Sequence, residues 1–319
     1  MALSRIDTHH HLFPPEYLAA VKERGVKAGG GVTFPEWSPE ASLEIMDRHG
    51  IETAVLSLAS PGVDLGDAAL ARELARNCNE YGAELMRKYP ARFGYFACVP
   101  LPNTADAVAE TAYAYDTLKC DGIVLLADSG DRFLGDPEFE ELMQELNRRN
   151  AIVFVHPNVH STSRHLGLKF PEALFEFLAD TTRAFLNLVL SGTLHRHPNI
   201  RWILSHAGAA IPAHAWRWAL ADRHPVVRKN APDGVLSYLS RLYFDTALSP
   251  SRNAMRPVLD LAGPDRVLFG SDYPYAHGDV LDFEIMELDR LDVFDGAGRE
   301  KMTRSNALSL FPRFNESKN

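Results

Sequence analysis

The stretch LSRIDTHHH at residues 3–11 determines how the rest of this chain is interpreted. Its alternating apolar and polar start is typical of a β-strand, in which successive side chains point to opposite faces. Asp7, His9 and His11 therefore share one face. Two imidazoles held two residues apart on a strand can bind one divalent ion through neutral nitrogens. We expect a metal site at the end of this strand, with His10 on the opposite face as a packing or surface residue.

Three later stretches repeat the pattern of a short apolar run followed by a potential ligand or proton carrier: IVFVHP at 152–157, WILSHAG at 202–208 and VLFGSDYP at 267–274. Along the chain, eight expected strands alternate with helical patterns. The strands are predicted at 5–12, 52–59, 92–99, 122–127, 152–156, 201–206, 242–246 and 266–271, and the helices at 39–49, 67–88, 104–118, 137–150, 171–191, 212–222, 250–261 and 280–289. This alternation predicts a parallel sheet closed as a single (β/α)8 barrel.

Three segments fall outside the repeat, yet no linker or low-complexity tract divides the chain, so we expect one domain over residues 1–319. Residues 13–37, with glycines at 29–31, form an insertion after the first strand and a candidate flexible lid. Residues 226–240 form an extra helical piece, and residues 292–319 a C-terminal helical tail.

The composition excludes several classes of protein. With 319 residues, 46% of them hydrophobic, the chain can bury a large core, and its net charge of -9 argues against binding to nucleic acid or an anionic membrane. Its three cysteines have no C-x-x-C spacing, so a disulfide framework is not expected. No signal peptide is recognisable, and no apolar run reaches the roughly 18 residues that cross a bilayer. A cytoplasmic protein is expected.

In a barrel of this kind the active site forms at the C-terminal ends of the strands. The residues at those ends are His9, His11, His156, His206 and Asp272. Three imidazoles and a carboxylate suit Zn²⁺ or another first-row divalent ion. Asp7, deeper on the first strand, is a candidate to orient one of the imidazoles from behind. Asp245, at the end of the seventh strand, is a candidate to contact substrate or to orient a neighbour.

These motifs resemble those of the amidohydrolase superfamily, and in particular its decarboxylase-type branch of aminocarboxymuconate semialdehyde and salicylate- or resorcylate-type decarboxylases. The resemblance extends along the whole chain through DTHHH at 7–11, VHP at 155–157, SHAG at 205–208 and GSDYP at 270–274, in family order. It implies that His9, His11, His156 and Asp272 bind the metal, with His206 beside it as a proton carrier. The expected fourth strand, GIVLLAD at 122–128, lacks the lysine that bridges two metals in binuclear members. One ion is expected, with Zn²⁺ preferred and Mn²⁺ as the alternative.

The resemblance implies a metal-dependent, non-oxidative decarboxylase of a phenolic, salicylate-like or related unsaturated carboxylic acid. Because loss of CO2 leaves a carbanion, Asp272 or a metal-bound water, relayed by His206, would protonate the ring carbon. Arg217 occupies the place of an arginine that, in the semialdehyde decarboxylases, binds substrate in the neighbouring subunit. A homodimer or homotetramer is therefore expected, although a solvated helix charge is an equal alternative for Arg217.

A second family arginine has no counterpart in GVTFPEW at 31–37, which favours a monocarboxylate such as a salicylate with an apolar substituent. Phe34 and Trp37 are candidate walls for it. Two other functions stay open: a hydrolase or hydratase on the same barrel, which opens a lactone or hydrates a double bond, and a non-catalytic binding protein.

Overall fold

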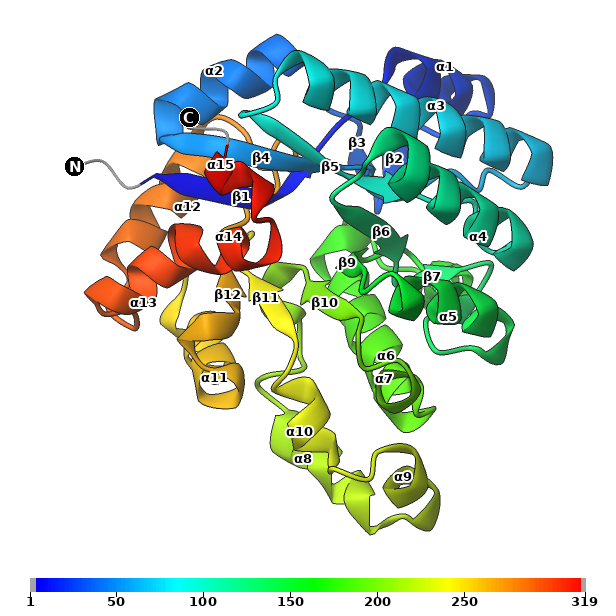
Figure 1. Ribbon diagram of the computed structural model, residues 1–319, viewed down its shortest axis with the longest axis vertical. Helices are drawn as coiled ribbons and strands as arrows, with labels where there is room; N and C mark the ends of the chain where they lie inside the picture. The colour runs from blue at the N-terminus through cyan, green and yellow to red at the C-terminus, as the bar shows by residue number, and fades with distance from the viewer. Residues whose placement is uncertain (1–3, 317–319) are drawn as a thin grey trace.

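The computed structural model describes residues 4–316, and its eight main strands form one parallel sheet curled into a barrel (Figure 1). In spatial order they are β1 (Arg5–His11), β4 (Ile51–Ser57), β5 (Phe93–Cys98), β6 (Gly122–Leu126), β9 (Ile152–His156), β10 (Arg201–Leu204), β11 (Tyr243–Asp245) and β12 (Val267–Leu268). The last strand meets the first through Thr8 N to Phe269 O at 2.9 Å and His11 N to Tyr273 O at 2.7 Å. The predicted (β/α)8 barrel is confirmed.

Helices cover the outside of the sheet (Figure 1). They are α2 (Pro39–His49), α3 (Ala68–Lys88), α4 (Thr104–Tyr113), α5 (Glu140–Arg148), α6 (Glu176–Leu190), α11 (Arg252–Ala262) and α12 (Asp279–Arg290). Several begin where a side-chain oxygen accepts a hydrogen bond from a backbone N–H of the first turn, as Ser38, Asp67, Asn103 and Ser251 do. The predicted positions of these elements are thus close to the observed ones.

The insertion after β1 consists of α1 (Pro15–Glu23) and a small hairpin of β2 (Ala28–Gly29) and β3 (Val32–Thr33). A second hairpin, β7 (Asp128–Ser129) and β8 (Arg132–Phe133), follows β6. Before β11, the short helices α8 (Ala215–Ala219), α9 (Pro225–Asn230) and α10 (Val235–Leu239) project away from the barrel at the bottom of Figure 1. Another short helix, α7 (Thr193–Arg196), precedes β10.

The C-terminal tail closes one end of the barrel. It contains α13 (Gly296–Glu300), α14 (Asn306–Leu310) and α15 (Arg313–Glu316), while residues 1–3 and 317–319 of the predicted domain lie outside the described part. Phe311 and Phe314 belong to the same buried cluster as Phe96 and Phe154, which point into the barrel, and the Phe311 and Phe96 rings lie 5.8 Å apart. This apolar plug fills the end opposite the site described below.

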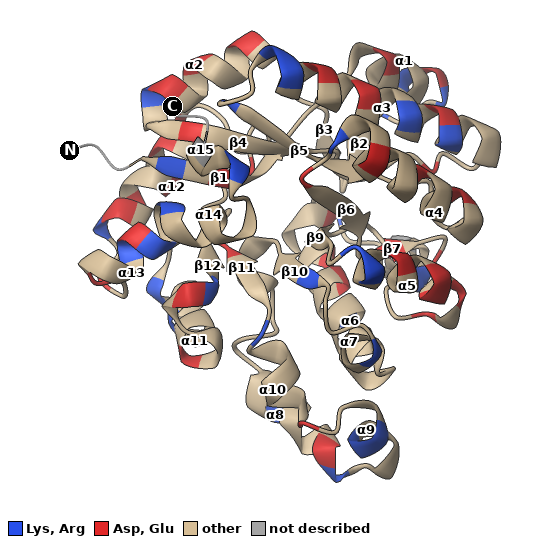
Figure 2. Cartoon of the chain, viewed as in Figure 1, with Lys and Arg blue, Asp and Glu red and all other residues tan. Residues whose placement is uncertain are grey.

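The outer surface carries charges of both signs. Figure 2 shows lysine and arginine interspersed with aspartate and glutamate along the outer helices α2, α3, α5 and α12, whereas the strands are largely free of charge. Within residues 4–316, the helices are too short or too polar for any of them to cross a bilayer.

Candidate metal centre and active site

Four side chains meet at the C-terminal ends of the strands. One ligand atom from each of His9, His11, His156 and Asp272 lies within 4.8 Å of those of the other three. His9 Nε2 is 3.1 Å from His11 Nε2, and Asp272 Oδ1 is 3.0 Å from His11 Nε2 and 3.2 Å from His9 Nε2. All four residues are buried. The structure therefore brings together the residues that the sequence predicted as ligands.

These distances suit a single divalent ion. Two donors about 2.1 Å from one metal, at angles of about 90–110°, are separated by about 3.0–3.4 Å. The pairwise distances among His9, His11 and Asp272 fall in or beside this range. Nitrogen and carboxylate donors of this kind bind Zn²⁺ and Mn²⁺. The buried donor set thus fits one divalent cation.

Backbone geometry explains how the ligands leave their strands. Asp272 and His206 adopt left-handed φ values of 56° and 53°, which non-glycine residues in strands avoid. β10 ends at Leu204, before His206, and β12 ends at Leu268, before Asp272; both end earlier than the predicted ends at 206 and 271. Gly270 permits the tight approach, because a Cβ there would lie 2.8 Å from His9 Cβ.

Hydrogen bonds behind the ligands fix the imidazole rings. His9 Nδ1 is 2.7 Å from Asp245 Oδ2, and the other Asp245 oxygen accepts the His206 N–H at 2.7 Å. His156 Nδ1 faces the Pro157 carbonyl at 2.8 Å. With their Nδ1 atoms engaged as donors, His9 and His156 present Nε2 as the metal-binding atom. Asp245 therefore orients a ligand, one of the two roles left open for it.

Asp7 has a different partner from the one expected. Its Oδ2 lies 3.0 Å from Nδ1 of His10 and accepts the Ser271 hydroxyl, while Oδ1 accepts the backbone N–H groups of His9 and Ser271. The reason is an irregularity in β1, where the pairing with β4 shifts between Asp7 and His10 and breaks strict alternation. Asp7 thus fixes the backbone and the buried, non-ligating His10 rather than a ligand ring.

Burial and neighbouring charges shift the pKa values of the four ligands in different directions. Burial opposes protonation of His9, but the Asp245 and Asp272 carboxylates outweigh it and raise the pKa of His9 to about 10. Burial lowers the pKa of His11 and, together with the neighbouring imidazoles, that of His156. Burial opposes ionisation of Asp272, yet the His9 charge and the His11 and His206 hydrogen bonds lower its pKa well below the usual range. Without metal, His9 is therefore the one cationic ligand.

A cavity of about 390 Å³ lies directly over these ligands. His156, His206 and Asp272 form its polar floor, and His206 Nε2 lies 3.5 Å from Asp272 Oδ2. The walls are mostly apolar and comprise Val32, Ala59, Ala173, Leu174, Phe177, Leu178, Leu248 and Tyr275. Of the described residues, none that lines the cavity is a lysine or an arginine. The cavity suits a small, largely apolar ligand that binds through one polar end.

Three residues predicted to bind substrate lie elsewhere in this chain. Phe34 packs against Phe13 and Tyr17, and Trp37 packs against Tyr81. Both are absent from the cavity lining, because the insertion turns through its hairpin and places Val32 over the site instead. Arg217 is exposed on α8, in a separate groove with Leu186, Leu190 and Trp218. Its role as a substrate-binding residue stays a prediction that requires a second subunit.

Several residues that line the cavity were not predicted from the sequence. Phe177 comes from α6, far from any predicted strand end, and its ring packs edge-on to His156 at 5.7 Å. No local pattern identifies such a residue, because its position depends on the path of the loop after β9. Tyr275 was easier to predict, because it lies only three residues after Asp272. Its ring is 5.6 Å from that of His11.

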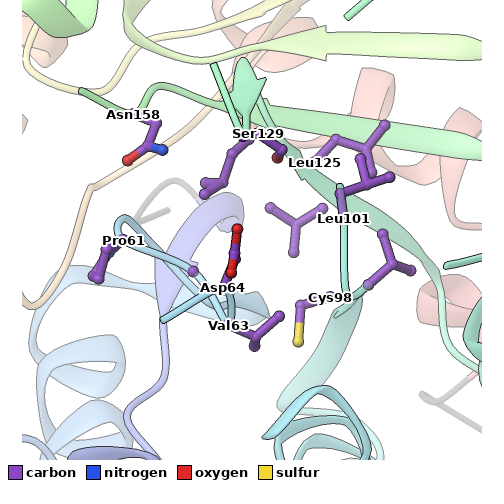
Figure 3. Close-up of a pocket in the computed structure, with 13 residues that line it drawn as sticks. Pro61, Val63, Asp64, Cys98, Leu101, Leu125, Ser129 and Asn158 are labelled. Atoms are coloured by element: carbon purple, nitrogen blue, oxygen red, sulfur yellow. The ribbon is translucent and has the colours of Figure 1, made fainter. Parts of the chain in front are cut away.

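A second, smaller cavity of about 80 Å³ lies beside the first, between the loops that follow β4, β5 and β6 (Figure 3). Pro61, Asp64, Ser129 and Asn158 contribute to its lining. Ser60, which lines the larger cavity, donates a hydrogen bond to Asn158 Oδ1 at 2.8 Å. Ser60 and Asn158 together therefore stand between the two cavities.

Comparison with known proteins yields one consistent family. The family model described as Amidohydrolase matches residues 6–313. The chain is 36% identical to Decarboxylase yanB of Aspergillus niger, over 98% of this chain and 88% of that protein. It is 33% identical to the 6-methylsalicylic acid decarboxylase of Penicillium expansum, over 98% and 97% of the two chains.

Among solved structures, the barrel superposes on 5-carboxyvanillate decarboxylase from Novosphingobium aromaticivorans, complexed with manganese and 4-hydroxy-3-methoxy-5-nitrobenzoic acid. The TM-score is 0.85 at 22% identity, over 97% of this chain and 96% of that one. This likeness concerns the fold. The resemblance to the decarboxylase-type branch that the motifs indicated is confirmed.

Proposed function

The chain belongs to the amidohydrolase family, within its branch of aromatic-acid decarboxylases, and we propose that it removes CO2 from a salicylate-type acid with an apolar ring substituent. The observation that carries this proposal is the cluster of His9, His11, His156 and Asp272 at the floor of an apolar cavity of about 390 Å³. The named activity of the Penicillium expansum relative, on 6-methylsalicylic acid, supports the same substrate class.

The protein residues divide the chemistry between them. A divalent cation held by the four ligands would bind the carboxylate and its neighbouring phenolic oxygen and draw charge out of the ring. Asp272 and His206 both reach the cavity floor, and their 3.5 Å separation allows a proton to pass between them. When the bond between the ring and the carboxyl group breaks, its electron pair stays on the ring carbon as CO2 leaves. That carbon takes up a proton from this pair, and His206 regains the proton from solvent.

The walls account for the choice of substrate. Phe177 and Val32 offer an apolar surface for the aromatic ring and its substituent. A second carboxylate would find no cationic partner within the same subunit, because none of the described lining residues is a lysine or an arginine. A monocarboxylate is therefore favoured over a dicarboxylate.

For the metal, the donor set of three imidazoles and one carboxylate leaves Zn²⁺ as our first expectation. Manganese in the solved 5-carboxyvanillate decarboxylase supports Mn²⁺ as the alternative. Metal analysis of protein purified without added metal distinguishes the two.

We also propose that the chain acts as one catalytic domain in a homodimer or homotetramer, with Arg217 facing the neighbouring subunit. The segment from α8, which carries Arg217, to α9 exposes Trp216, Leu220 and Val226, an apolar set that is typical of an interface. Mixing Arg217→Ala subunits with His206→Ala subunits should then restore activity in part of the sites. A cytoplasmic location, expected from the sequence, stays a prediction.

The deciding experiment is a screen of substituted hydroxybenzoates with detection of released CO2. We expect turnover of 6-methylsalicylate and weaker turnover of salicylate. Lactones serve as controls for the hydrolase alternative. His9→Ala and Asp272→Asn should abolish turnover and metal retention together. Metal-loaded protein that hydrolyses a lactone and releases CO2 from none of the acids would refute the proposal.

A further inference from the structure

Two buried carboxyl groups lie side by side behind the active site. Asp128 begins β7 directly after β6, and Asp180 lies on α6; their exposed fractions are 2% and 1%. The two carboxyl groups are close enough to interact directly, and in each of them the Oδ1 atom is buried and has no hydrogen-bond partner among the described residues. One proton held between two such carboxyl groups would satisfy both, because an ionised carboxylate can only accept hydrogen bonds.

The positive charges near the pair, on His160 and Arg183, do not offset the burial of two carboxylates. Among the described residues, no lysine or arginine forms an ion pair with either group. Arg183, one turn along α6, pairs with Glu176 at 3.8 Å. His160 bonds to Thr162, and Asp131 adds a further negative charge nearby. Burial and the Asp128 charge accordingly raise the pKa of Asp180 to about 8.

The pair holds the loop that follows the metal ligand of β9. Asp180 Oδ2 accepts the backbone N–H of Asn158 at 2.8 Å. Asn158 follows Pro157, whose carbonyl lies 2.8 Å from His156 Nδ1, and its side chain accepts the Ser60 hydroxyl. One residue thus connects the carboxyl pair to the ligand His156 and to the cavity wall at Ser60.

We propose that Asp128 and Asp180 share one proton and act as positioning residues, which hold the loop at Asn158 and thereby keep His156 and Ser60 in their catalytic arrangement. The inference rests on the proposed function for its activity readout. Loss of the proton leaves two facing negative charges, which drive Asp180 away from Asn158. The small cavity beside Asn158 and Ser129, about 80 Å³ in volume, gives the loop room to shift (Figure 3).

The first measurement is the amide hydrogen exchange of Asn158 in metal-loaded protein, because this N–H is the one that Asp180 accepts. We expect its protection factor to fall about tenfold between pH 7 and 9 in the wild type. In Asp180→Asn the amide oxygen still accepts from Asn158 and the amide N–H₂ donates to Asp128, so protection should not change with pH. Asp128→Asn, which donates to Asp180 in the same way, is the second variant in case the first fails to fold.

The second measurement is the alkaline limb of kcat/KM. We expect about a tenfold loss from pH 7 to 9 in the wild type, no such loss in either asparagine variant, and activity at pH 7 within about threefold of wild type. Asp180→Ala, which removes the acceptor, should lower both activity and Asn158 protection at every pH. Glu284→Gln is the control, because Glu284 is another buried carboxyl whose pKa burial raises to about 8.

Different results would refute this inference and the proposed function. The inference is overturned if Asn158 protection does not depend on pH in the wild type, or if Glu284→Gln rather than Asp180→Asn removes the pH dependence. If the wild type releases no CO2 from any acid, the proposed function fails. The exchange measurement then still decides for or against the shared proton.

Discussion

Metal uptake by the metal-free protein should release about one proton at pH 7.5, and that proton comes from His9. The carboxylates of Asp245 and Asp272 raise the pKa of His9 to about 10, whereas a metal ligand must be a neutral imidazole. Because pH 7.5 lies about 2.5 units below this pKa, competition with the proton lowers the apparent metal affinity about 300-fold, or by about 3 kcal/mol. His11 and His156 have lowered pKa values and Asp272 is already ionised, so these ligands release none.

The sign of the pH dependence follows from this. Because the folded protein raises the pKa of His9 above its ordinary 6.5, the charged imidazole contributes to the stability of the metal-free protein fully below pH 6.5. That contribution is lost as pH rises toward 10. Metal affinity changes in the opposite direction and should increase about tenfold per pH unit across the same window. As pH rises, the metal-free form therefore becomes less stable, and the additional stability that the metal provides becomes larger.

Calorimetric titration with Mn²⁺, in buffers of different ionisation enthalpy, counts the released protons. Asp245→Asn keeps an oxygen for His9 Nδ1 but removes the charge, so we expect clearly less than one proton and a shallower pH slope. Asp7→Asn is the matched control, since this buried carboxylate contacts the His10 ring instead and should leave the count at one. A wild type that releases no proton, or an Asp245→Asn variant that equals it, refutes the reasoning.

Three further predictions concern the cavity. His206→Asn should retain the metal and lose about 10²–10⁴-fold in kcat, because His206 lies outside the ligand set; metal analysis beside kinetics checks this. Gly30→Ala should lower the free energy of unfolding by about 1–3 kcal/mol in chemical denaturation, because its φ is 56° and a Cβ would overlap Phe177. Gly25→Ala, with a φ of 72° but nothing within 4 Å, should cost only about 1 kcal/mol. Phe177→Ala should raise kcat/KM for salicylates with bulkier apolar substituents relative to 6-methylsalicylate, and equal losses on both would contradict its place in the wall.

The barrel and its ligands were predictable because both depend on local, repeated signals. A short apolar run ending in histidine or aspartate recurs at β1, β9 and β12, and a closed parallel sheet brings such ends together whatever their separation in sequence. The position of Asp245 at the end of a strand was predicted in the same way, but the residue that it contacts was not. Choosing His9 as that partner requires the register between strands, which the sequence does not encode locally.

The cavity walls were not predictable for a related reason. Phe34 and Trp37 lie in the insertion that does reach the site, yet the residue of that insertion over the cavity is Val32. Which side of a short hairpin faces inward depends on its contact with the 3-10 turn Glu172–Leu174 before α6, where Gly30 O accepts the Ala173 N–H at 2.9 Å. The irregular pairing of β1, which redirects Asp7 toward His10, is likewise invisible to strict alternation.

The C-terminal tail bears on how the catalytic end is assembled. Phe311 and Phe314 fill the end of the barrel opposite the metal site. Until they dock, Phe96 and Phe154 face water from below, and Phe154 packs edge-on to the His9 ring at 4.9 Å. A variant truncated before Phe311 should therefore hold the metal ion less tightly, because Phe154 would lose the packing that supports the His9 ring.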